Sequence, residues 1–300
     1  MCRIASRAEN STSKALRGFG ITTVVLALLA AGAAVAVERG ILPGRVRLHA
    51  WLGLNGPGTP IPDVQHGSIQ TASFHSAARG REVSYSIFWP RGARPTRLIL
   101  ALHGYGNDHN GAEDDLGMSE FQAEAIDAGV PAFAVVSVDA GVGFYHPFRG
   151  DDASAMILHE LLPRLGQAGL DTHRIGLYGW SMGGYGALRL ATLLGPHRVA
   201  GVAAVSAALW QNPSDAPTVS FAGAADYERY SVMHAQAALA RIPLRIEVGD
   251  GDPFLNADRE FVAGFGGSVA LSVTSGGHTD GYWRSRLLGD LEFLGRRLAA

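Results

Sequence analysis

Apolar and polar positions alternate between residues 68 and 90, as they do in half-buried strands. The segments 68–76 (SIQTASFHS) and 81–90 (REVSYSIFWP) each follow this period of two. Between them, residues 77–80 (AARG) fit a bend. We therefore expect two strands that pair antiparallel.

Further along, the pattern changes to short, continuous apolar runs with polar residues at their C-terminal ends, as in buried parallel strands. The runs lie at residues 97–104, 133–140, 174–181, 199–207, 244–252 and 269–277. Helical patterns lie between or after them, at 151–169, 183–195 and 282–299. This alternation predicts an α/β fold with a mostly parallel central sheet flanked by helices. Ligands of such sheets bind beyond the C-terminal strand ends.

Composition limits the class of protein. The chain has 300 residues, of which 47% are hydrophobic, so it can bury a full core. Its net charge is -2 and 17% of its residues are charged, which gives no reason to expect a nucleic-acid partner. The single cysteine, Cys2, excludes an internal disulfide and a cysteine-based zinc site.

An uncharged, apolar stretch at residues 19–37 predicts a transmembrane anchor or a signal segment. It follows a basic flank at 1–18 and would reach roughly 28 Å as a helix, close to the thickness of a bilayer's hydrocarbon core. The long flank favours an uncleaved anchor, whereas Ala34-Val35-Ala36 suits a cleaved signal peptide. The flank should stay in the cytoplasm, so the remainder is expected to be exported. It would stay at the cell membrane, or be secreted or kept in the cell envelope after cleavage.

The predicted strands and helices all lie in the C-terminal part of the chain. Residues 38–65 are rich in Gly and Pro and have little periodicity, which indicates a linker. Residues 66–300 are then expected to form one catalytic or binding domain.

Ser181 is the strongest candidate for a reactive residue. It lies in GWSMG, between a predicted strand and a predicted helix, and this matches the G-x-S-x-G of a nucleophile elbow. Gly179 and Gly183 supply the small neighbours that such a strained turn requires. The alternative is a glycine-rich turn in which the serine is incidental.

A serine hydroxyl needs a base, and His278 is the favoured candidate. It follows the last predicted strand, and two glycines let its loop bend across the sheet. The base in turn needs a carboxylate that holds its tautomer. The loop VGDGDPF offers Asp252, which we favour because it lies deeper in the loop, and Asp250 as the alternative.

An oxyanion hole requires two backbone N–H groups. We expect them to come from Met182, which follows the serine, and from Tyr105, in the loop HGYGND after an earlier strand. His103 in that loop is interpreted as a residue that orients it.

Two further candidates lie past another predicted strand end. Tyr145 and His146 in GFYHPF could contact an acyl or ring-bearing substrate, or could belong to a loop packed over the core. Several acidic and histidine residues after residue 102 lack metal-binding spacing, so we expect a solvated polar loop and no metal. These residues are His103, Asp108, His109, Glu113, Asp114 and Asp115.

The order Ser181, Asp252, His278 resembles that of α/β-hydrolases. The sequences GWSMGGYGA, GDGDPF and GGHTDGYW, with the lead-in SFHSAARGREVSYSIFWP, resemble the "Putative esterase" branch, which includes esterase D and the mycobacterial mycolyltransferase antigens. The resemblance covers roughly residues 66–298. It implies an α/β-hydrolase fold and chemistry through an acyl-serine. The few residues at 210–241 indicate a short or absent lid.

The sequence therefore predicts a serine esterase that hydrolyses carboxylic esters, with a small-molecule or lipid ester as substrate and without a cofactor. An acyltransferase of the cell envelope that uses the same triad is the alternative, because the two differ only in what attacks the acyl-enzyme. A catalytically silent surface binding protein on the same scaffold is the rival from another class.

Overall fold

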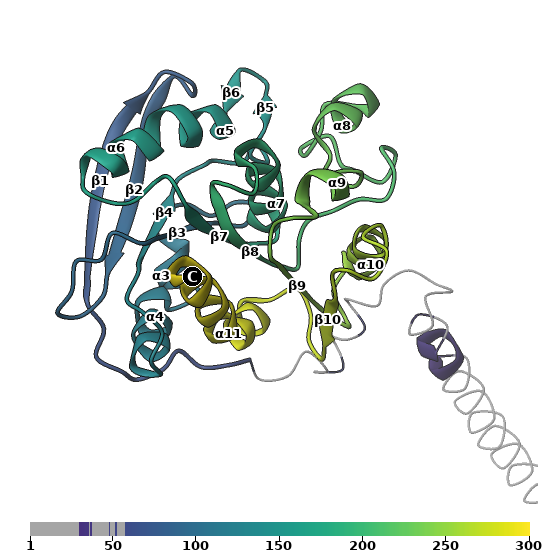
Figure 1. Cartoon of the computed structure of the whole chain (residues 1–300). Coiled ribbons are helices and arrows are strands. Elements are labelled where there is room, and N and C mark those ends of the chain that lie inside the picture. The colour runs from purple at the N-terminus through teal and green to yellow at the C-terminus, as the bar shows by residue number, and fades with distance from the viewer. Residues whose placement is uncertain (1–29, 36, 38–47, 49–51, 53–57) are drawn as a thin grey trace, which may run out of the picture. The chain divides into compact units, whose positions relative to one another are not determined.

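The structure is a computed structural model, and it describes residues 30–35, 37, 48, 52 and 58–300 (Figure 1). The basic flank at 1–18 lies outside the described residues, as do most of the predicted anchor or signal segment at 19–37 and of the linker at 38–65. Residues 30–35 are helical. Within the described ranges, no helix has both the length and the apolarity needed to cross a bilayer.

An eight-stranded sheet organises residues 58–300, with the strand order β1-β2-β4-β3-β7-β8-β9-β10 (Figure 1). β1 pairs antiparallel with β2, as expected, and β2 pairs antiparallel with β4, whereas the other neighbours are parallel. The strands are β1 (Ser68–Ser76), β2 (Arg81–Trp89), β3 (Leu98–Leu102), β4 (Ala134–Val138), β7 (Ile175–Trp180), β8 (Val199–Val205), β9 (Leu244–Gly249) and β10 (Leu271–Thr274). A separate two-stranded ribbon consists of β5 (Pro147–Phe148) and β6 (Asp151–Asp152).

Helices cover both faces of the sheet, which confirms the predicted α/β fold. They are α3 (Gly111–Asp114), α4 (Met118–Asp127), α5 (Ala153–Ala155), α6 (Leu162–Gln167), α7 (Met182–Leu194), α8 (Ala224–Tyr230), α9 (Gln236–Leu239), α10 (Leu255–Ala263) and α11 (Asp280–Ala299). A π-helical segment, Met156–Leu161, joins α5 to α6. Pro163 follows this segment, and its ring would crowd the carbonyl four residues earlier in a regular α-helix.

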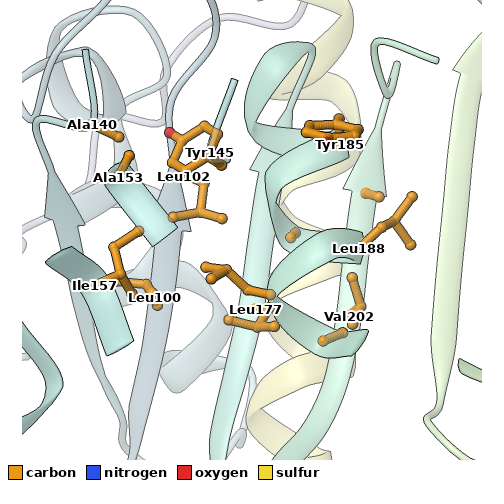
Figure 2. Packing of buried hydrophobic residues seen from close by; sticks show 14 of the residues in the cluster. Leu100, Leu102, Ala140, Tyr145, Ala153, Ile157, Leu177, Tyr185, Leu188 and Val202 are labelled. Atoms are coloured by element: carbon orange, nitrogen blue, oxygen red, sulfur yellow. The ribbon is translucent and has the colours of Figure 1, made fainter. Parts of the chain in front are cut away.

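The central strands are continuous apolar runs because both of their faces are buried. Leu100 of β3 and Leu177 of β7 pack on the face covered by α7 (Figure 2). Their neighbours Ile99 and Tyr178 point to the opposite face, where α4 and α11 pack. Successive side chains of a strand alternate between faces, so two-sided burial removes the polar positions from the pattern.

The parallel strands end at one common edge of the sheet. The loops that leave β3, β4, β7, β8, β9 and β10 therefore start at the same edge, and the sequence candidates are in or next to these loops. The connection from β8 to β9 carries two short helices, α8 and α9.

Candidate active site

Ser181 occupies a strained turn between β7, which ends at Trp180, and α7, which begins at Met182. Its φ of 56° and ψ of -120° are unusual for a residue with a side chain. The surrounding backbone is tightly packed: a Cβ at Gly179 would lie 2.1 Å from the carbonyl oxygen of Gly183. The two glycines around the serine are thus a steric requirement of this turn.

Ser181, His278 and Asp252 are joined by two hydrogen bonds. The distance from Ser181 Oγ to His278 Nε2 is 2.9 Å, and that from His278 Nδ1 to Asp252 Oδ2 is also 2.9 Å. An ionised carboxylate can only accept a hydrogen bond, so Nδ1 carries the proton and Nε2 is free to accept from the serine. The three side chains are thereby arranged for proton transfer from Ser181 to His278.

Local backbone bonds fix the two loops that supply His278 and Asp252. The backbone N–H of Phe254 donates to Asp252 Oδ1 over 2.9 Å, which occupies the second carboxylate oxygen. Thr279 caps α11 by accepting from the N–H of Tyr282, so His278 lies directly before a rigid helix start. Asp250 accepts from the N–H of Gly276 over 3.1 Å. Asp250 therefore joins the two loops, and Asp252 is the acid that contacts the histidine.

Aromatic rings hold the plane of the His278 imidazole. Phe254 lies 5.3 Å away between ring centroids, and Trp283 lies 5.0 Å away in an edge-on orientation. Neither residue was among the candidates predicted from the sequence. Their position next to Asp252 and His278 in the chain is the signal that could have indicated them.

The two expected oxyanion donors belong to segments that adjoin Ser181. Met182 is the first residue of α7, so its N–H has no acceptor within the helix. Tyr105 follows Gly104, where a Cβ would lie 3.5 Å from the Cβ of Ser181. The loop after β3 thus packs against the serine at Gly104, the residue before Tyr105.

His103 is buried and ties this loop to the one after β4. Its Nδ1 lies 2.8 Å from the carbonyl oxygen of Gly104, and the N–H of Ala140 donates to its Nε2 over 3.0 Å. Burial lowers the pKa of His103, so the ring stays neutral and can accept at Nε2. This arrangement agrees with its interpretation as a residue that orients the loop.

Tyr145 and His146 are packed inside the protein, which favours the second of their two interpretations. Both are fully buried. The Tyr145 hydroxyl donates to the carbonyl oxygen of His103 over 3.1 Å. His146 stacks between the rings of Phe221 and Tyr230, with centroid distances of 5.0 and 4.8 Å. These contacts are those of a loop packed over the core, with neither side chain exposed.

One group of described residues has the spacing of metal ligands. Ligand atoms of His66, Glu113 and Glu120 lie within 4.8 Å of one another. Glu113 already accepts from the backbone N–H of Ser119 over 3.0 Å, and His66 is exposed. The two glutamates of this group are half-buried, and the chemistry of Ser181 does not need the group.

Comparisons with known proteins indicate one family. A family model described as "Putative esterase" matches residues 76–294. No curated protein matches the chain.

Solved structures share the fold at low sequence identity. A ferulic acid esterase is 21% identical with a TM-score of 0.67, over 77% of this chain and 98% of that one. FphF, a fluorophosphonate-binding serine hydrolase of Staphylococcus aureus, is 16% identical with a TM-score of 0.65, over 77% and 99%. An S-formylglutathione hydrolase from Agrobacterium tumefaciens is 19% identical with a TM-score of 0.61, over 78% and 99%.

Proposed function

The chain belongs to the "Putative esterase" family, and we propose that it is a serine esterase in which Ser181, His278 and Asp252 form the catalytic triad. The observation that carries the proposal is the pair of hydrogen bonds, each of 2.9 Å, that runs from Ser181 through His278 to Asp252. The strained backbone of Ser181 supports it further, because strain of this kind is characteristic of a nucleophile elbow.

In the first half of the reaction, Ser181 Oγ attacks the ester carbonyl carbon while His278 Nε2 takes the hydroxyl proton. The N–H groups of Met182 and Tyr105 hold the negative charge that develops on the carbonyl oxygen. The carbon–oxygen bond to the alcohol then breaks, and His278 returns its proton to the departing alcohol. The acyl group remains on Ser181.

In the second half, water attacks the acyl-serine. His278 takes a proton from the water, the bond to Ser181 Oγ breaks, and the proton passes to Ser181. Asp252 keeps the same tautomer of His278 throughout and stabilises the imidazolium. The products are a carboxylic acid and an alcohol, and the enzyme returns to its starting state.

Replacement of the nucleophile tests this proposal. Ser181→Ala should lower kcat/KM on p-nitrophenyl acetate by about 10⁴-fold or more, because the acyl-enzyme cannot form. Ser206 directly follows β8 and has a similar positive φ of 50°, so Ser206→Ala is a matched control that should keep its activity. A fluorophosphonate probe should label wild type and the control but not Ser181→Ala. Equal hydrolysis by wild type and Ser181→Ala would contradict the proposal, and unlabelled folded wild type would favour the silent binding protein.

The acceptor of the acyl group distinguishes an esterase from an acyltransferase. Water is the acceptor in our proposal. If methyl ester accumulates faster than free acid when methanol is added at modest concentration, the chain is a transferase that uses the same triad.

Two finer features of the proposal concern the N-terminal segment and the lid. We place the catalytic domain outside the cytoplasm, behind an anchor or leader at residues 19–37. We expect its lid to be short or absent, because the connection between β8 and β9 carries only two short helices. Protease accessibility of the catalytic domain on intact cells, compared with a chain that lacks residues 1–37, tests the location.

A further inference from the structure

Four aromatic side chains and His278 form a continuous line of rings at the C-terminal edge of the sheet. The centroid distances are 6.0 Å from Tyr105 to Phe144, 5.6 Å from Phe144 to Trp210, 5.5 Å from Trp210 to Phe254 and 5.3 Å from Phe254 to His278. We refer to these residues as the aromatic arc. They come from the loops that follow five different strands, β3, β4, β8, β9 and β10.

One end of the aromatic arc contacts Ser181, and the other end belongs to a loop that packs against it. At one end, His278 Nε2 is 2.9 Å from Ser181 Oγ. At the other end, Tyr105 follows Gly104, whose Cβ position would be 3.5 Å from the Cβ of Ser181. Both ends of the arc therefore come from loops that adjoin Ser181, and the arc forms a wall beside the candidate nucleophile.

Part of this wall is open to a ligand. Tyr105 is 52% exposed, and Trp210 and Phe254 are half-buried. Phe144 is buried behind Tyr105 and Trp210 and supports them. The exposed rings lie on both sides of Phe144 along the arc, so a group bound near Ser181 can contact more than one ring.

The relative orientation of the rings favours a planar aromatic partner. Trp210 stands at 90° to Phe254 and at 53° to Phe144, so ring edges and ring faces both point along the wall. An aromatic ring gains from edge-to-face and offset contacts in addition to the area that it buries, whereas a saturated ring gains from the area alone. A flexible alkyl chain would not use these orientations.

We propose that the aromatic arc selects esters that carry an aromatic ring, with Trp210 and Phe254 as the residues that determine this specificity. The inference rests on the proposed function, because it needs Ser181 as the nucleophile. The ring can belong to the acyl half or to the alcohol half of the ester, since the arc runs from the oxyanion side of Ser181 to the side of His278.

Matched ester pairs test this specificity. In the acyl arm, kcat/KM is compared for methyl 3-phenylpropanoate and methyl 3-cyclohexylpropanoate. In the alcohol arm, the pair is 2-phenylethyl acetate and 2-cyclohexylethyl acetate. Within each pair the reacting bond is the same and the ring is remote from it. The cyclohexyl group is the more apolar one, so burial alone would favour it, whereas the aromatic arc should favour phenyl by about tenfold in one arm.

Leucine substitutions test whether the aromatic arc causes the preference for phenyl esters. Trp210→Leu and Phe254→Leu should each bring the phenyl-to-cyclohexyl ratio close to one. Phe293→Leu is the control: Phe293 is a half-buried aromatic residue of α11 that packs near Gly201, towards the other end of β8, and its loss should leave the ratio unchanged. Inhibition by 3-phenylpropanoate and by 3-cyclohexylpropanoate gives the same comparison without turnover, and thermal melting identifies a variant that has not folded.

The outcomes separate this inference from the proposed function. If wild type hydrolyses the esters in a Ser181-dependent way but prefers phenyl in neither arm, the inference is overturned and the esterase assignment stands. A preference that survives both leucine substitutions also overturns it. If folded wild type hydrolyses none of the four esters and takes no fluorophosphonate, the proposed function fails and the inference fails with it.

Discussion

Asp252 and Asp258 lie close together in the sequence, one in the loop after β9 and the other in α10, and both side chains are buried. Asp252 has a partner at each carboxylate oxygen, His278 at one and the N–H of Phe254 at the other. Asp258 has no hydrogen-bond partner for either oxygen among the described residues. Burial, with the Asp252 carboxylate as a smaller cause, raises the pKa of Asp258 well above its ordinary value.

The comparison shows that burial alone does not give an acidic residue a role. Donors to a carboxylate favour its ionised form, whereas burial without donors favours the protonated form. Asp252 has a donor at one oxygen and contacts His278 with the other, whereas the raised pKa of Asp258 makes this carboxyl destabilise the fold as the pH rises. Three substitutions test this contrast.

The largest effect is expected from Asp252→Asn. The amide keeps the shape of the side chain and can still accept from Phe254, but it can donate to His278 Nδ1 and so favour the wrong tautomer. We expect kcat/KM on p-nitrophenyl acetate to fall by about 10³–10⁴-fold with little change in melting temperature. A fall of less than tenfold would mean that Asp252 is not the triad acid.

Asp258→Asn should instead change stability. In the unfolded chain this carboxyl ionises near its ordinary value, whereas the folded protein keeps it protonated to higher pH. The folded state therefore binds more protons between these two pKa values, and wild type loses stability as the pH rises through that window. The amide removes this loss, so the gain in melting temperature over wild type should be larger at pH 8 than at pH 5.

Exposed Asp63→Asn is the control for this measurement. If Asp258→Asn raises the melting temperature equally at both pH values, or lowers it by more at the higher pH, the raised pKa of Asp258 is contradicted.

The smallest effect is expected at Asp250, which contacts the backbone of the histidine loop and not His278 itself. Asp250→Ala removes the acceptor for the N–H of Gly276 and should lower kcat by about tenfold or less through a looser loop. Asp250→Asn keeps an acceptor oxygen and should restore most of the rate. A loss at Asp250→Ala as large as that at Asp252→Asn would reverse the assignment of the two acids.

The strands could be predicted from the sequence because their hydrophobic patterns are local. The predicted runs at 97–104 and 199–207 contain β3 and β8, since two-sided burial requires apolar residues at every position of a central strand. The antiparallel pairing of β1 with β2 followed from the short bend between them. Ser181 could be predicted for a related reason, because the steric demands of its turn require glycines at fixed positions in the sequence around it.

The surroundings of individual side chains could not be predicted in this way. Asp258 lies in a polar stretch, NADRE, that is typical of a protein surface, yet its side chain is fully buried. His146 is polar and follows a strand end, which suggests a site, but rings from distant segments enclose it. Trp210 and Phe254 join the aromatic arc only through contacts between separate loops.

The sequence by itself determined the strands, the parallel sheet and the chain order of Ser181, Asp252 and His278, because burial periodicity and turn sterics act between near neighbours. The tertiary structure decided which acid meets the histidine, which buried aspartate has no hydrogen-bond partner for its carboxylate among the described residues, and which aromatic rings lie beside the serine. These outcomes depend on distances of a few ångströms between loops that are far apart in the chain, and no local pattern encodes such distances.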